Sequence, residues 1–69
     1  MIKVKDFLKL DNSGLMFSVI DASQPGCKSL NPKVMMEADK NVINWNYGEW
    51  TVDSFEPKTK RNIYLWIKK

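Results

Sequence analysis

The sequence predicts a small α+β domain: a small antiparallel sheet of three to four strands with one short N-terminal helix. Apolar residues alternate with polar ones over 49–55, and aliphatic residues alternate with aromatic ones over 62–67, which is the period of two expected of paired strands. All three tryptophans and both tyrosines lie within 42–69, so we expect this C-terminal hairpin to hold most of the core. With 69 residues, the chain has room for a single domain, 1–69.

The N-terminal part of the chain predicts a helix followed by a strand. Val4, Phe7 and Leu8 have the spacing of one helical face, which favours a short helix over 3–10 that docks on the sheet. Residues 15–21 are largely apolar in both alternating phases. We therefore expect a central strand there, covered on both faces.

The middle of the chain is expected to be largely irregular. Pro25 and Gly26 stand in the order of a type II turn. Residues 27–30 are compatible with a short strand, and 33–38 with a strand or a single turn of helix. The asparagine-rich stretch 39–46 is expected to be a loop whose apolar residues attach it to the core.

The two strands of the C-terminal hairpin are expected to be joined by a connection over 56–61, where Pro57 stops the first strand. Ser54 and Phe55 interrupt the alternation that begins at Trp50. A β-bulge near Ser54 would return Phe55 to the same face as Trp50, and we predict one there.

The net charge of +3 is unevenly distributed along the chain. Residues 1–36 carry five Lys against three Asp, residues 37–57 one Lys against five acidic residues, and residues 58–69 four Lys and one Arg. The net charges of these three segments are +2, −4 and +5. We favour attraction between facing strands as the explanation, with a basic edge that meets an anionic partner as the alternative.

Composition argues against several functional classes. Cys27 is the only cysteine and histidine is absent, so neither an internal disulfide nor a structural zinc site is expected. Gly26, Lys28 and Ser29 are P-loop residue types, but the first glycine of that motif is missing. We expect no enzyme, cofactor or metal. No apolar run matches a signal peptide or a membrane span, which favours a cytoplasmic protein away from the membrane.

Two sets of residues are candidate binding surfaces. For a protein partner, the candidates are aromatic residues in the loop and in the last strand: Trp45, Tyr47, Tyr64 and Trp66. The alternative is single-stranded nucleic acid, whose bases stack on rings while cations meet its phosphates: Lys58, Lys60, Arg61, Tyr64, Trp66, Lys68 and Lys69. The surplus of aromatic residues favours the protein partner, and self-association as a homodimer is a further expectation.

The order of segments resembles that of small accessory proteins of unknown function from phages and mobile elements of Gram-positive bacteria. The similarity rests on the helix that begins Val4-Lys5-Asp6-Phe7-Leu8, on the Gly-initiated apolar strand, and on the strand from Trp50 to Pro57 that turns into 63–67. It is an outline without a specific motif, so no functional residue is transferred. The resemblance implies a non-enzymatic protein-binding module, for example a phage-encoded inhibitor of a host or defence protein.

Overall fold

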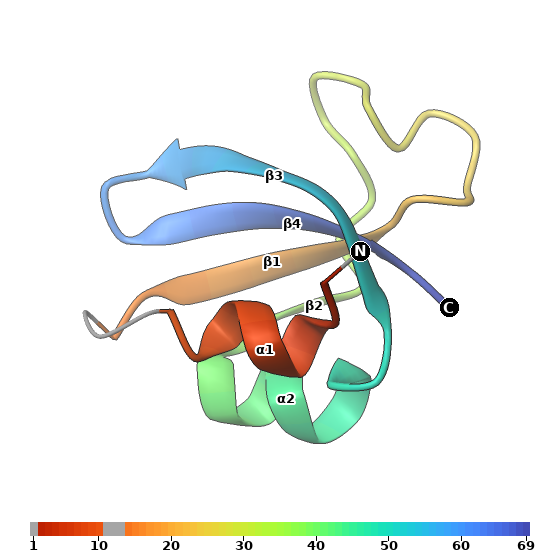
Figure 1. The fold of residues 1–69 in the computed structure, drawn as a ribbon. Helices are drawn as coiled ribbons and strands as arrows, with labels where there is room; N and C mark the ends of the chain where they lie inside the picture. The colour runs from red at the N-terminus through yellow and green to blue at the C-terminus, as the bar shows by residue number, and fades with distance from the viewer. Residues whose placement is uncertain (1, 11–13) are drawn as a thin grey trace.

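The computed structural model describes residues 2–10 and 14–69. Its helices and strands follow in the order α1 (Val4–Leu8), β1 (Met16–Asp21), β2 (Met36–Asp39), α2 (Lys40–Tyr47), β3 (Thr51–Thr59) and β4 (Asn62–Lys68). The strands form one sheet in the order β2-β1-β4-β3, with both helices on one face (Figure 1). The long connection from β1 to β2 lies at the other face and contacts Trp66 there.

The α+β fold class is confirmed, with two corrections. The sheet is mixed rather than antiparallel, because the central strands β1 and β4 run parallel, with Met16 opposite Asn62 and Asp21 opposite Ile67. The structure also has a second helix, α2. An alternation of period two is the same for parallel and antiparallel strands, so the sequence pattern does not distinguish them.

The core lies between the helices and the sheet. It is built from residues of both helices and of the two central strands: Val4, Leu8, Phe17, Val19, Ile43, Leu65 and Ile67, each at most 3% exposed. On the opposite face of β1, Ser18 and Ile20 are buried as well. The prediction of a central strand covered on both faces is therefore confirmed.

The asparagine-rich stretch predicted to be a loop is helix α2. Asp39 caps it, since its Oδ1 accepts hydrogen bonds from the backbone N–H groups of Asn41 at 3.0 Å and Val42 at 3.1 Å. Asparagine has a low helix propensity, so the composition of this stretch does not predict a helix. The cap and the burial of Ile43 stabilise it. Ile43 is the fully buried residue of α2, and Tyr47 packs against the core while partly exposed. Val42 and Trp45 face solvent.

The connection between β1 and β2 contains no strand before Met36, so the short strand considered for 27–30 is absent. Residues 27–30 form turns and bends instead. Gly26 has φ of +76°, as the third position of a type II turn requires. The strand considered for 33–38 is present as β2, which begins at Met36.

The predicted β-bulge in the hairpin is present. The register of β3 against β4 shifts between Val52 and Ser54. Phe55 therefore reaches the helix face, where its ring centroid lies 5.0 Å from that of Phe7 in α1. Trp50 packs against the core on the same face.

The hairpin connection is much shorter than predicted. Thr59 pairs with Asn62, so the turn itself comprises only residues 60 and 61. Pro57 remains within the strand, opposite Ile63. A proline is tolerated there because β3 is an edge strand, where a missing N–H need not remove a ladder hydrogen bond.

The N-terminal segment is bound to the start of β3. The N–H of Val4 donates to the carbonyl of Trp50 at 2.8 Å. The ammonium groups of Lys3 and Lys5 lie 2.9 and 2.8 Å from the carboxylate of Glu49, and their hydrogen bonds lower the pKa of Glu49 to about 2.

Among the described residues, neither helix is long and apolar enough to cross a membrane.

Candidate functional site

The four aromatic residues predicted to bind a protein partner lie in two separate places. Trp45 and Tyr47 belong to α2 on the helix face of the sheet. Tyr64 and Trp66 belong to β4 and point to the opposite face. The structure therefore offers two candidate surfaces instead of one.

Trp45 is the centre of the first surface. Its side chain is 88% exposed, and neighbouring Val42 is 42% exposed. The exposed residues of α2, which we call the α2 face, are all uncharged: Asn41, Val42, Asn44, Trp45 and Asn46. The surface is bounded by lysines on one side, where Asn41 and Asn44 line a hollow together with Lys5, Lys9 and Lys40. The sequence signal for α2 was Asp39, a residue type that favours the N-cap position and so indicates that a helix begins after it.

Tyr47 has a structural role despite its position beside Trp45. Its ring meets that of Trp50 edge-on, with centroids 5.2 Å apart and an interplanar angle of 90°. Both rings are partly buried and pack against the core. Tyr47 therefore supports α2 from the inside and does not extend the α2 face.

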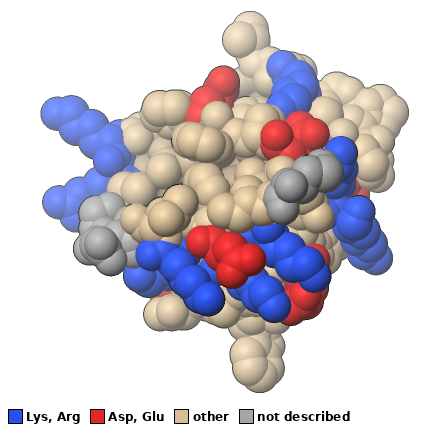
Figure 2. Space-filling model, viewed as in Figure 1, with Lys and Arg blue, Asp and Glu red and all other residues tan. Residues whose placement is uncertain are grey.

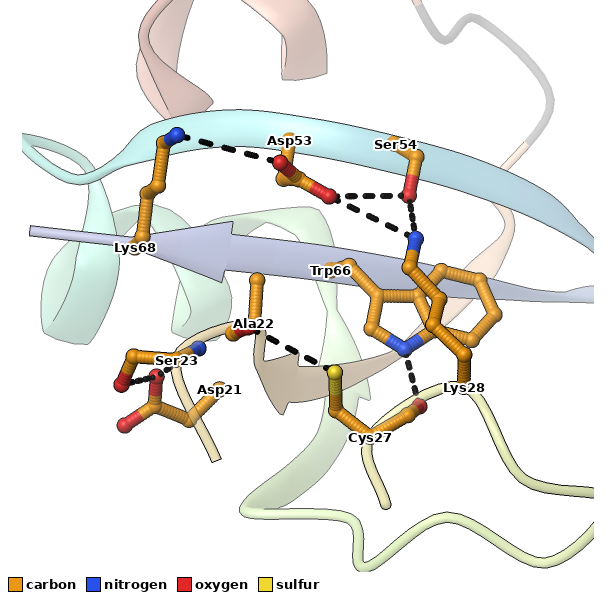
Figure 3. A network of polar contacts seen from close by, with 9 residues as sticks. All are labelled: Asp21, Ala22, Ser23, Cys27, Lys28, Asp53, Ser54, Trp66 and Lys68. Carbon is orange, nitrogen blue, oxygen red and sulfur yellow. Dashed lines mark hydrogen bonds and ion pairs between the residues drawn. The ribbon is translucent and has the colours of Figure 1, made fainter. Parts of the chain in front are cut away.

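Trp66 is covered, with only 4% of its surface exposed. Its Nε1–H donates to the backbone carbonyl of Cys27, and the Lys28 ammonium lies 4.4 Å from the ring centroid (Figure 3). The same ammonium lies 3.4 Å from the carboxylate of Asp53 and donates to the hydroxyl of Ser54. In this conformation Trp66 has no free surface for a partner.

Tyr64 is half-buried beside Trp66, with the two ring centroids 5.6 Å apart. The ammonium of Lys58 lies 5.4 Å from the Tyr64 centroid and 3.2 Å from the carboxylate of Glu37. The ring of Tyr64 is therefore partly exposed to solvent, beside the ion pair of Lys58 and Glu37.

A polar cluster occupies the same face of the sheet. The fully buried hydroxyl of Ser18 lies 3.0 Å from Glu37 Oε2 and 2.9 Å from Asn62 Oδ1. Hydrogen bonds from Ser18, Lys58 and Asn62 lower the pKa of the Glu37 carboxyl. The cluster therefore joins all four strands, and the hydroxyl of Ser18 at its centre is inaccessible.

The cations predicted to meet phosphates do not form one patch. Lys58 and Lys68 are paired with Glu37 and Asp53, at 3.2 and 3.9 Å, and Lys69 lies over the ring of Trp50 at 5.4 Å. Lys60 and Arg61 form the exposed turn of the hairpin. On the face seen in Figure 2, lysines and arginines lie in several separate places, with acidic groups beside some of them.

No group of three or more His, Cys, Asp or Glu residues in the described part of the chain could hold a metal ion. Comparison with known proteins yields no match to a family model, to a curated protein or to a solved structure.

Proposed function

We propose that this protein is a non-enzymatic binding module for a protein partner, and that the α2 face is its contact surface. The observation that carries the proposal is the 88% exposure of Trp45 on a capped helix. Tryptophan is enriched among the residues that dominate binding energy at protein interfaces. Since Trp45 adds almost nothing to the core, its exposure is best explained by an external contact.

The charge of the α2 face supports the same proposal. Interface centres are depleted of charged residues, because burying an unpaired charge is unfavourable. Asn41 and Asn44 are exposed on the same helix as Trp45 and carry amides that can both donate and accept hydrogen bonds, whereas the Asn46 amide already donates to the carbonyl of Val42. The α2 face thus combines one large apolar anchor with a neutral polar rim.

The α2 face is small for a stable interface with any partner. Eight residues of helix span only about 12 Å, whereas a stable interface buries about 800 Å² on each partner. A partner with an apolar pocket for the Trp45 indole would compensate for this small area. By the resemblance to phage accessory proteins, that partner would be a bacterial host or defence protein. Homodimer formation through this face should be weak.

The nucleic-acid alternative remains a prediction with less geometric support. Trp66 is covered, and Lys58 and Lys68 are already paired with carboxylates. Titration with a single-stranded oligonucleotide at low salt, where counterion release is strongest, is the direct test.

Site-specific crosslinking in cells of the source organism tests the α2 face. A photoreactive amino acid replaces Trp45 in one variant and Thr59, an exposed residue beside the turn of the hairpin, in the other. We expect position 45 to yield a discrete protein adduct that position 59 does not, and purified Trp45→Ala protein to compete less well than wild type. The same adducts from both positions would contradict the proposal.

A folding control accompanies this experiment. Because Trp45 is exposed, Trp45→Ala should change the free energy of unfolding by no more than about 0.5 kcal/mol, as measured by urea denaturation. A loss of competition without a loss of stability then reports on binding alone.

A further inference from the structure

The segment 22–35, which we call the strap, crosses the sheet face opposite the helices. It contains no helix or strand, and none of its residues is buried. Each end is attached to the sheet by a backbone hydrogen bond. The N–H of Ala22 donates to Ile67 and that of Met35 to Val19, both at 2.8 Å. Segments with few buried contacts are those that open locally while the rest of a protein stays folded.

Between its two ends, the strap is held to the sheet mainly at one place. There the carbonyl of Cys27 accepts the indole hydrogen bond of Trp66, and Lys28 lies over the ring (Figure 3). Hollows lie on both sides of this contact. One of about 410 Å³ is lined by Ile20, Asp21 and strap residues, and one of about 390 Å³ by strap residues, by 54–56 of β3, and by Tyr64 and Trp66. The strap is therefore poorly packed against the sheet away from the contact.

We infer that the strap opens as a unit about its two ends while the sheet and helices remain folded, and that this opening exposes the paired rings of Tyr64 and Trp66. Opening breaks the Trp66 hydrogen bond and the contacts of Lys28 but no β-ladder and no contact of the main core. The strap thus gates a second aromatic surface, separate from the α2 face. Closed, it withholds Trp66 from any partner; open, it presents Trp66 beside Tyr64.

The indole N–H of Trp66 is a direct reporter of opening, because its acceptor belongs to the strap. Its exchange with deuterium can be followed by NMR on the unmodified protein, together with the backbone amides of β4. We expect the protection factor of the indole proton, taken relative to an unprotected Trp indole, to be at least tenfold lower than those of the slowest amides of β4. Equal protection factors would mean that Trp66 is exposed only by global unfolding, which would overturn the inference.

Two variants act on the closed strap in different ways. Lys28→Gln removes the cation over the ring and its ion pair, and should speed exchange of the Trp66 indole about threefold to tenfold. Gly26→Ala leaves the contacts with Trp66 untouched but places a side chain at φ of +76°. We expect about tenfold faster indole exchange from that strain.

Gly14→Ala is the matched control. Gly14 also has positive φ, +71°, and an added Cβ meets no atom within 4 Å at either glycine. Gly14 precedes β1 and lies outside the strap, so its substitution should not speed the Trp66 indole relative to the amides of β4. If Gly14→Ala and Gly26→Ala accelerate the indole equally, or if neither strap variant does, the inference is wrong.

Discussion

The two faces of the sheet are covered in different ways. Under the helices, residues from distant parts of the chain form a continuous apolar core. Under the strap, Ile20 and Trp66 are buried beside the polar cluster around Ser18, with hollows on both sides of the Cys27 contact. Successive residues of β1 and β4 thus point alternately into the apolar core under the helices and into the more polar region under the strap. The comparison suggests that stability resides mainly on the helix face and that local motion belongs to the strap face.

The largest expected effect comes from truncating one isoleucine on each face. Ile43 and Ile20 are 0% and 2% exposed. Ile43→Ala should lower the free energy of unfolding by about 2 to 5 kcal/mol, because the packed core cannot collapse onto the cavity. Ile20→Ala should cost less, since the strap can move into the space. Urea denaturation followed by circular dichroism measures both.

Val42→Ala is the control for these truncations, because Val42 neighbours Ile43 on α2 but is 42% exposed. Its effect should stay within about 0.5 kcal/mol. An Ile20→Ala variant as destabilised as Ile43→Ala would remove the proposed difference between the faces.

A smaller effect is expected from the cap of α2. Asp39→Ala removes the acceptor for two backbone N–H groups and should cost about 0.5 to 2 kcal/mol. Because α2 covers only the helix face, the exchange rate of the Trp66 indole itself should not change, whereas the slowest amides of β4, which exchange by global unfolding, should exchange faster. Thermal denaturation and hydrogen exchange test the two parts of this expectation, with Asn41→Ala as a control that retains the cap.

The smallest effect is the dependence of stability on pH. The pKa of Glu49 falls from 4.5 to about 2, chiefly through hydrogen bonds from Lys3 and Lys5, and that of Glu37 is also lowered. A carboxyl whose pKa is lower in the folded state contributes stability above its unfolded pKa and loses it as the pH falls through the folded pKa. Stability should therefore decline between about pH 4.5 and about pH 2.

Substitution by glutamine separates the two carboxyls. Glu49→Gln should flatten the decline more than Glu37→Gln, while Glu56→Gln, at a residue with no ion pair among the described residues, should leave it unchanged. Urea midpoints measured from pH 6 to pH 2 provide the comparison. If Glu56→Gln flattened the decline as much as Glu49→Gln, general charge repulsion would be the cause.

Much of the sheet was predictable because the relevant signals are local. Alternation identified β1, β3 and β4, and the interrupted alternation at Ser54 identified the bulge. The helix α2 was missed because its asparagines have low helix propensity, and Asp39 was not recognised as its cap. The connection of the hairpin was predicted to be longer than it is, because Pro57 was expected to end the first strand. A proline would interrupt a central strand, but it is tolerated in an edge strand such as β3.

The candidate sites were predictable only as a list of residue types. Trp45 was expected to help attach a loop to the core and is instead the most exposed tryptophan, whereas Trp66, a candidate contact for either partner, is buried. The burial of Trp66 has no signal in the neighbouring residues, because its cover comes from Cys27 and Lys28, far away in the chain.

By itself, the sequence determined which residues share a face of each strand, because the pleat sends successive side chains to opposite sides. It therefore separated Leu65 and Ile67 from Tyr64 and Trp66. Only the tertiary structure decided that β1 and β4 pair in parallel and that the helices cover one face and the strap the other. Those outcomes depend on contacts between segments distant in the sequence, which local periodicity does not encode.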